Sequence, residues 1–177
     1  MEPVTRRLLL VVGSAPCTRR AVIVAAALAR DWDAEVIVCR ARTKRPSRGG
    51  PIASEALEHA RDAVDAAGDA LVRLGTTVPE RLVLTSLDRP AEAVLRAARH
   101  GAVSMVVVTH PGWRSFSDWQ STREARRLLS RSEVPVLVVG PDRVRIRRSA
   151  RQRAGGVPVR PPRPRDRSGA RGRPGSA

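Results

Sequence analysis

Hydrophobic residues follow two patterns along the first 140 positions: short continuous apolar runs, and longer stretches in which apolar residues recur every three or four positions. The first run, residues 8–12, stops at Gly13, and such a run is typical of a strand buried on both faces of a sheet. Residues 21–29 are apolar nearly all round, which predicts a helix buried against that sheet. Residues 36–39 form the second predicted strand. The charged, Gly-rich and Pro-rich residues 42–51 after it predict a mobile connection.

The clearest helical pattern lies between residues 52 and 74, where apolar residues recur at helical spacing and acidic residues occupy other positions. The apolar stripe consists of Leu57, Ala60, Val64, Ala67, Leu71 and Leu74. Gly75 is expected to end this helix. Residues 81–85 predict a third strand, more polar than the others, as an edge strand would be. Asp88, Arg89 and Pro90 predict the cap of a short helix.

Two more apolar runs, residues 103–108 and 134–139, predict the last strands, with a helix near residues 121–131 between them. Because strands and helices alternate throughout, residues 1–140 predict one doubly wound α/β domain. Its five-stranded parallel sheet would carry helices on both faces. After residue 140 the apolar periodicity stops, and Arg, Pro, Gly and Ser dominate. Residues 141–177 are therefore predicted to be a disordered tail.

The net charge is concentrated in that tail. The chain carries +16, of which residues 141–177 supply +10 through 12 Arg and 2 Asp. A flexible arginine-rich chain binds polyanions without sequence preference, so the tail predicts non-specific association with nucleic acid. The alternative is a solubilising extension, favoured because the tail has no aromatic residue to stack on bases.

Three sequence features bear on the location of the protein and on its chemistry. The sequence lacks the roughly 20-residue apolar stretch of a membrane span and the layout of a signal peptide, and its two cysteines form no disulfide framework, so a cytoplasmic location is expected. His59, His100 and His110 share no metal-binding spacing, and no Gly-x-Ser-x-Gly motif raises a nucleophile. No metal site or hydrolase chemistry is therefore expected.

The chain resembles a known family in three segments. Residues 8–29 resemble the first strand, loop and helix of the universal stress proteins. Residues 89–95, Arg-Pro-Ala-Glu-Ala-Val-Leu, resemble the family segment Gly-x-Pro-Ala-Glu-Ala-Ile/Leu, with Asp88 where Gly is usual. Residues 134–139, Val-Pro-Val-Leu-Val-Val, resemble its Cys-Pro-Val-Leu-Val-Val ending. The resemblance covers nearly all of residues 6–140. It implies strand order 3-2-1-4-5 and a homodimer that pairs through residues 134–139, an edge otherwise left open.

The resemblance also raises the question of ATP. Ligands of doubly wound sheets bind beyond the carboxyl ends of the strands. In this chain the loops at those ends are residues 13–18 and 109–122. One branch of the family binds ATP there through Gly-x-x-Gly, nine residues and Gly-Ser/Thr, with an Asp at the end of the first strand. Glycine amides and a helix N-terminus suit phosphates.

This chain departs from that motif. Thr109 replaces the first glycine, Gly112 keeps the second, Thr122 and Arg123 replace the final pair, and Gly13 replaces the aspartate. The resemblance is closer to the branch that does not bind ATP, which implies a non-enzymatic dimeric regulatory or stress-protective factor without a cofactor. The alternative is an ATP-binding member with weak ATPase activity. Its degenerate site would use Gly13, Val38, Thr109, Gly112 and Thr122.

Two further groups of residues have alternative interpretations. Trp113, Phe116 and Trp119 lie in the loop after the fourth predicted strand, and are expected to pack over a helix or a dimer partner. Base stacking is the alternative. Cys17 and Cys39 are expected to be small buried hydrophobes, with a redox pair as the alternative.

Overall fold

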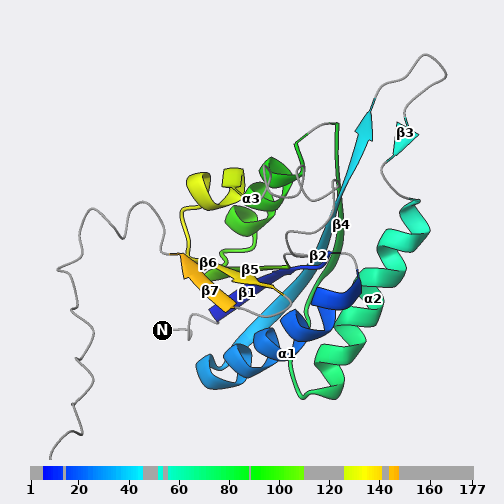
Figure 1. The fold of residues 1–177 in the computed structure, drawn as a ribbon. Helices are drawn as coiled ribbons and strands as arrows, with labels where there is room; N and C mark the ends of the chain where they lie inside the picture. The colour runs from blue at the N-terminus through cyan, green and yellow to red at the C-terminus, as the bar shows by residue number, and fades with distance from the viewer. Residues whose placement is uncertain are drawn as a thin grey trace, which may run out of the picture.

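Five parallel strands form the centre of the computed structural model, which describes residues 6–13, 15–45, 52–53, 56–87, 89–109, 126–140 and 144–147. The strands are β1 (Arg6–Val11), β2 (Ala34–Arg45), β4 (Arg81–Ser86), β5 (Met105–Thr109) and β6 (Val136–Val139). They pair in the order β4-β2-β1-β5-β6 (Figure 1). This is the predicted order 3-2-1-4-5 of the parallel strands, so the doubly wound α/β fold is confirmed.

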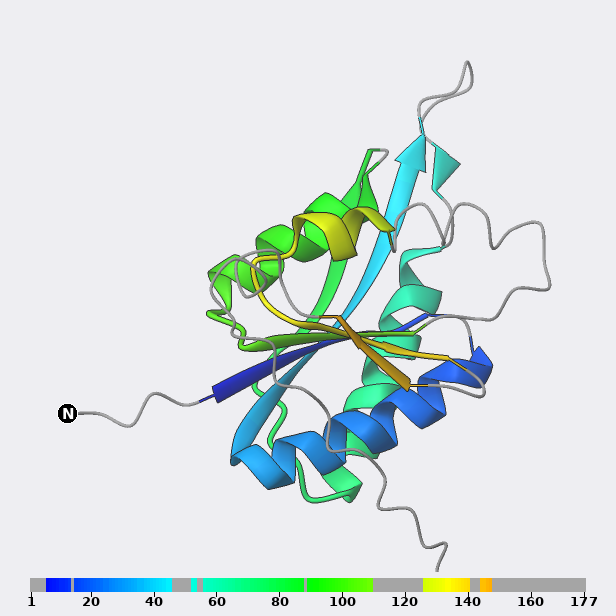
Figure 2. The same ribbon diagram turned by 60° about the vertical axis from the view of Figure 1, so that its left-hand side comes forward.

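Helices cover both faces of the sheet. α1 (Ala15–Trp32) and α2 (Leu57–Arg73) lie on one face, and α3 (Pro90–His100) and the helical residues 126–131 lie on the other (Figures 1 and 2). β1 is the central strand, as predicted, because Leu8, Leu9 and Leu10 are all fully buried. Side chains alternate along a strand. Leu8 and Leu10 therefore enter the core under α1 and α2, whereas Leu9 enters the core under α3.

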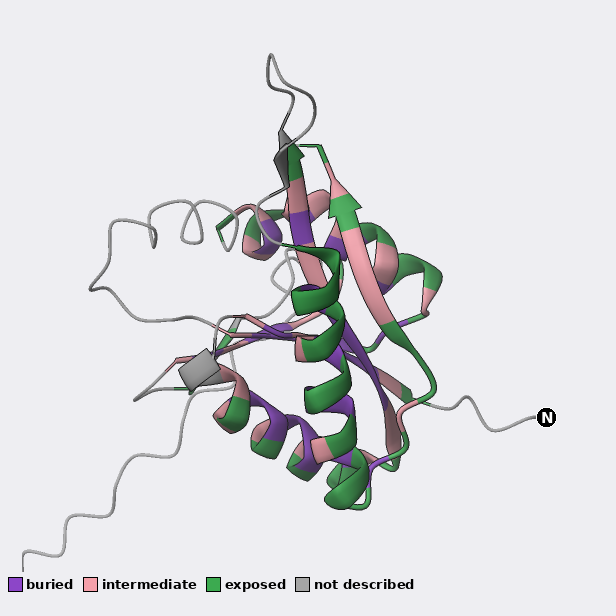
Figure 3. Ribbon diagram, turned by 90° about the vertical axis from the view of Figure 1, so that its right-hand side faces the viewer, coloured by how far each residue is buried: buried purple, intermediate pink, exposed green. Residues whose placement is uncertain are grey.

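Burial follows this layered plan. Figure 3 shows α2 exposed along its outer side, with buried positions turned toward the sheet.

Gly75 follows the C-terminal end of α2 with φ of 80°, a left-handed conformation that suits glycine and ends the helix as predicted. Arg81 at the start of β4 bonds Asp69 at 2.8 Å and Asp65 at 3.4 Å, and so links α2 to the sheet edge. The hydrogen bond to Asp69 raises the pKa of Arg81 above its ordinary value.

β2 extends further than its apolar pattern indicated. The strand continues to Arg45, and residues 38–43 pair in register with residues 81–86 of β4. The predicted mobile connection is therefore wrong for residues 42–45, because neighbouring strands supply backbone partners, β4 for residues 42–43 and a further short strand for residues 44–45. A two-residue strand, β3 (Ile52–Ala53), pairs antiparallel with Lys44 and Arg45. The long helix consequently begins at Leu57 and not near residue 52.

A last strand, β7 (Val144–Arg147), pairs antiparallel with β6 along residues 136–139. The prediction of disorder from residue 141 is wrong for these four residues, because the neighbouring strand satisfies their backbone groups. The open edge that the dimer prediction assumed at residues 134–139 is also wrong, since β7 covers residues 136–139 of it. The rest of the predicted tail lies outside the described residues. Among the helices that are described, none is long and apolar enough to cross a membrane.

Candidate functional site

The switch point of the sheet lies between β1 and β5. Val11 pairs with Val108, so Gly13 and Thr109 follow at the same edge. From this edge the chain passes from β1 into α1 on one face, whereas the helical residues 126–131, after β5, cover the opposite face (Figure 2). Ligands of doubly wound sheets bind at such points. Gly13 and Thr109 therefore occupy the place where a ligand of this fold would be held.

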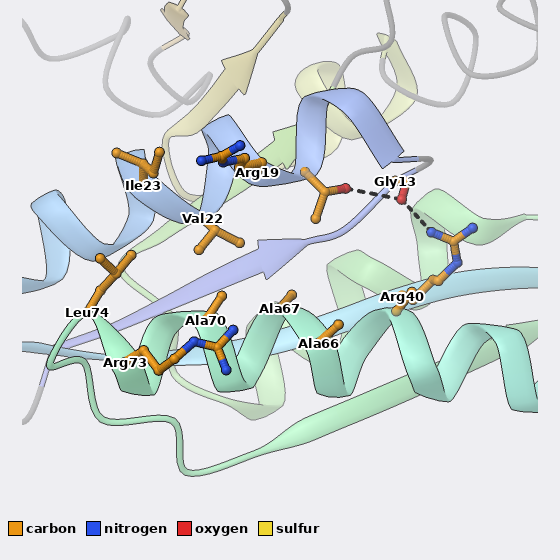
Figure 4. Close-up of a pocket in the computed structure, with 12 residues that line it drawn as sticks. Gly13, Arg19, Val22, Ile23, Arg40, Ala66, Ala67, Ala70, Arg73 and Leu74 are labelled. Atoms are coloured by element: carbon orange, nitrogen blue, oxygen red, sulfur yellow. Dashed lines mark hydrogen bonds between the residues drawn. The ribbon is translucent and has the colours of Figure 1, made fainter.

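The backbone carbonyl of Gly13 is already occupied by two donors. Arg40 Nη1 on β2 donates to this oxygen at 2.5 Å, and Thr18 Oγ1 on α1 donates to it at 3.2 Å (Figure 4). A carbonyl oxygen has two lone pairs, so these two bonds satisfy its capacity. The guanidinium of Arg40 thus joins the ends of β1 and β2 from within the protein.

Position 13 is tightly packed against the end of β5. A Cβ atom added to Gly13 would overlap Oγ1 of Thr109. An aspartate at the end of β1, as in the ATP-binding pattern, would therefore require the side chain of Thr109 to move. The two departures from that pattern are neighbours in space, although 96 positions in sequence separate them.

The remaining predicted site residues are placed differently. Val38 is fully buried, pairs with Leu10 in register and belongs to the core under α1 and α2, so its side chain does not reach a ligand site. Gly112 and Thr122 lie outside the described residues. The same holds for His110 and for the aromatic residues of that loop. The structure therefore brings together Gly13 and Thr109 of the five predicted residues.

Arg40 and Thr18 are site residues that the sequence analysis missed. Arg40 continues the alternation of Val36 and Val38 on one face of β2, and this spacing could have revealed it. Its charge instead suggested that the strand had ended. The contact between Thr18 and Gly13 depends on how the chain turns into α1, which the residue types do not reveal.

Cys39 is a free cysteine in the interior of the domain. Its side chain is fully buried in the core under α3, and burial raises the pKa of its thiol to about 12. A thiol with such a pKa stays protonated and unreactive at neutral pH. The interpretation as a small buried hydrophobe is therefore confirmed for Cys39, whereas the side chain of Cys17 lies outside the described residues. In the described part of the chain, no group of three His, Cys, Asp or Glu residues could hold a metal ion.

Comparisons with known proteins agree with this architecture. Residues 5–140 match the Universal stress protein family. A universal stress protein from Archaeoglobus fulgidus superimposes with a TM-score of 0.60 at 17% identity, over 77% of this chain and 94% of that chain. A structure of the universal stress protein from the same organism in complex with dAMP gives a TM-score of 0.58 at 17% identity, over 76% and 97%.

A family protein from Burkholderia pseudomallei gives a TM-score of 0.57 at 21% identity, over 75% of this chain and 94% of that chain. A search of curated protein sequences finds no match. At these identities the structural likeness supports the fold alone.

Proposed function

Because the chain belongs to the universal stress protein family, we propose that it is a non-enzymatic, cytoplasmic, dimeric regulatory or stress-protective factor that does not hold ATP at its strand ends. One observation carries this proposal: Oγ1 of Thr109 lies where a Cβ at position 13 would be, while Arg40 and Thr18 occupy the Gly13 carbonyl. Among the described residues, contacts within the chain thus take up the groups at the end of β1. A nucleotide that used the Gly13 carbonyl would have to break these contacts.

The alternative is an ATP-binding member with weak ATPase activity. It is favoured by the fold, since a universal stress protein from Archaeoglobus fulgidus is described in complex with dAMP and another member in complex with cAMP. Against it stands the cost of displacing the charge-assisted bond between Arg40 and Gly13, about 1.5–3 kcal/mol for a hydrogen bond to a charged group. We therefore favour the closed site.

Calorimetric titration of the full chain with ATP and magnesium tests this proposal. We expect no saturable heat up to millimolar nucleotide. Saturable binding at micromolar ATP would overturn the proposal and support the alternative. The variant Arg40→Ala is informative in that event, because an ATP site that uses Arg40 loses affinity, whereas a site that Arg40 only obstructs gains it.

The dimer in this proposal would form at the outer edge of β7, the last strand on this side of the sheet. The outer edge of β7 has no strand partner among the described residues, and Val144 and Ile146 are exposed beside it, Ile146 to 65%. An exposed edge with apolar side chains favours pairing with a second copy. Light scattering during size-exclusion chromatography should give the mass of a dimer for the native chain and of a monomer for Ile146→Lys. A monomeric mass for the native chain would contradict the proposed dimer.

A second proposal concerns the basic tail, which we infer associates with nucleic acid without sequence preference. Its support is the charge of residues 141–177, +10 of the total +16. Because β7 ends at Arg147, a deletion that spares the sheet starts at residue 148. Deleting residues 148–177 should abolish the retention of DNA at low salt, and retention by the native chain should fall steeply as salt rises. Unchanged retention after the deletion would refute this role.

A further inference from the structure

A long groove separates α1 from α2 on the face of the sheet that carries Arg40. Its volume is about 740 Å³, and it starts at Gly13 and Arg40 and runs between the two helices (Figure 4). Volumes of this size are typical of sites for small molecules. The groove shares Arg40 with the strand-end site but extends away from it along the helices.

The sides of the groove are aliphatic. α2 contributes four alanines at helical spacing, Ala63, Ala66, Ala67 and Ala70, and their small side chains keep the space between the helices open. α1 contributes Val22 and Ile23, of which Ile23 is 54% exposed. The described lining has no aromatic ring, so a nucleotide base would find nothing to stack on. The groove therefore suits a flexible hydrocarbon chain.

The charged residues of the groove all have the same sign. Arg19, Arg40 and Arg73 line it, and the described lining includes no acidic residue. Among the described residues, neither Arg19 nor Arg73 has an ion-pair partner. An apolar groove bordered only by guanidinium groups is complementary to a ligand with an aliphatic body and a negative charge.

Arg42 supplies an independent indication of an anion. It is only 5% exposed, and its Nε is buried without a hydrogen-bond partner in the described part of the chain. It follows Arg40 by two residues on β2, so both side chains leave the same face of the strand. A buried guanidinium nitrogen without a hydrogen-bond partner costs stability, and each such group calls for an explanation. A bound anion at this end of β2 would provide the missing partner.

We propose that the groove between α1 and α2 binds a long-chain aliphatic carboxylate. Its head group lies at the Arg40 end of the groove, toward Arg42, which follows Arg40 on the same face of β2 without lining the groove itself. Its hydrocarbon chain lies against the alanines of α2. Arg19 and Arg73 add positive potential along the groove. This site goes beyond the proposed function, because it concerns a ligand that is not a nucleotide and a groove that shares Gly13 and Arg40 with the strand ends but extends away from them between α1 and α2.

Titration of the full chain with dodecanoate below its micellar concentration tests the proposal. We expect saturable binding to one site, and no comparable binding of acetate, which lacks the chain, or of dodecanol, which lacks the charge. Arg40→Ala, which removes the guanidinium at the head group, and Ala70→Leu, which fills the groove, should each raise the Kd about tenfold, a change equivalent to about 1.4 kcal/mol. The matched controls on α2, Arg61→Ala and Val72→Leu, lie outside the groove lining and should leave the Kd unchanged.

The variant Arg42→Met separates a binding role from a structural one. Without ligand it should raise the Tm, because it removes a buried guanidinium whose Nε has no partner among the described residues, while keeping a side chain of similar length. Dodecanoate should then stabilise the native chain and fail to stabilise the variant.

The proposal is overturned if dodecanoate does not bind saturably, if Arg61→Ala weakens binding as much as Arg40→Ala, or if Arg42→Met lowers the Tm. The titration with ATP is a separate experiment. Because Ala70 lines the groove away from Gly13 and Arg40, the effect of Ala70→Leu tests the groove without deciding the proposed function.

Discussion

Replacing Leu10 with alanine is expected to lower the free energy of unfolding by about 3–5 kcal/mol. Leu10 is fully buried in the central strand and packs in the core under α1 and α2. Neighbours on two helices and two adjacent strands cannot close a cavity at this point. The lost transfer free energy and the cavity therefore both lower the free energy of unfolding. Urea unfolding followed by circular dichroism measures the change.

The matched control for this substitution is Leu87→Ala. Leu87 lies just after β4 and is 69% exposed, so the same change of side chain should alter stability by less than about 0.5 kcal/mol. Similar effects at both positions would contradict the assignment of β1 as the central buried strand.

Gly13→Ala is expected to cost about 1–3 kcal/mol, the usual range for an overpacked site. The added Cβ would overlap Oγ1 of Thr109. The β-branched side chain of Thr109 has few alternative rotamers that would remove this overlap. In a Thr109→Ala background the oxygen is gone, so most of the cost should disappear.

A double-mutant cycle on positions 13 and 109 therefore isolates the contact that closes the strand ends. The free energies of unfolding of the native chain, both single variants and the double variant are all needed. If the two substitutions add within about 0.5 kcal/mol, Gly13 and Thr109 are not in the proposed contact.

The sequence predicted the fold correctly in the segments whose residue types depend on burial alone. Residues 8–12 are continuously apolar because β1 is covered on both faces, and the stripe of α2 is regular because one side of that helix faces the sheet. These patterns, together with the family segments, were sufficient for the strand order.

The parts that the sequence did not reveal depend on backbone pairing. Arg40 and Arg42 lie in β2 because β4 offers hydrogen-bond partners, although their charges are typical of a loop. β7 carries arginines at alternate positions and lies in an arginine-rich region, so its four residues could not be told from the tail. Only the neighbouring β6 distinguishes them.

The candidate site shows the same limit. The sequence placed Gly13 and Thr109 at the strand ends and identified both as departures from the ATP motif. It could not show that a side chain at position 13 would meet Thr109, because that contact joins two strands distant in the chain. Nor could it show that Arg40 and Thr18 fill the hydrogen-bonding capacity at Gly13, or that Nε of Arg42 is buried without a partner among the described residues.

Mass spectrometry of the nucleotide fraction released from the freshly purified, denatured protein tests the central claim most directly. With the strand ends closed by Gly13, Arg40 and Thr109, the protein should release no adenine nucleotide in a stoichiometric amount. Release of about one ATP, ADP or AMP per chain would contradict the closed site and place this protein among the nucleotide-binding members of its family.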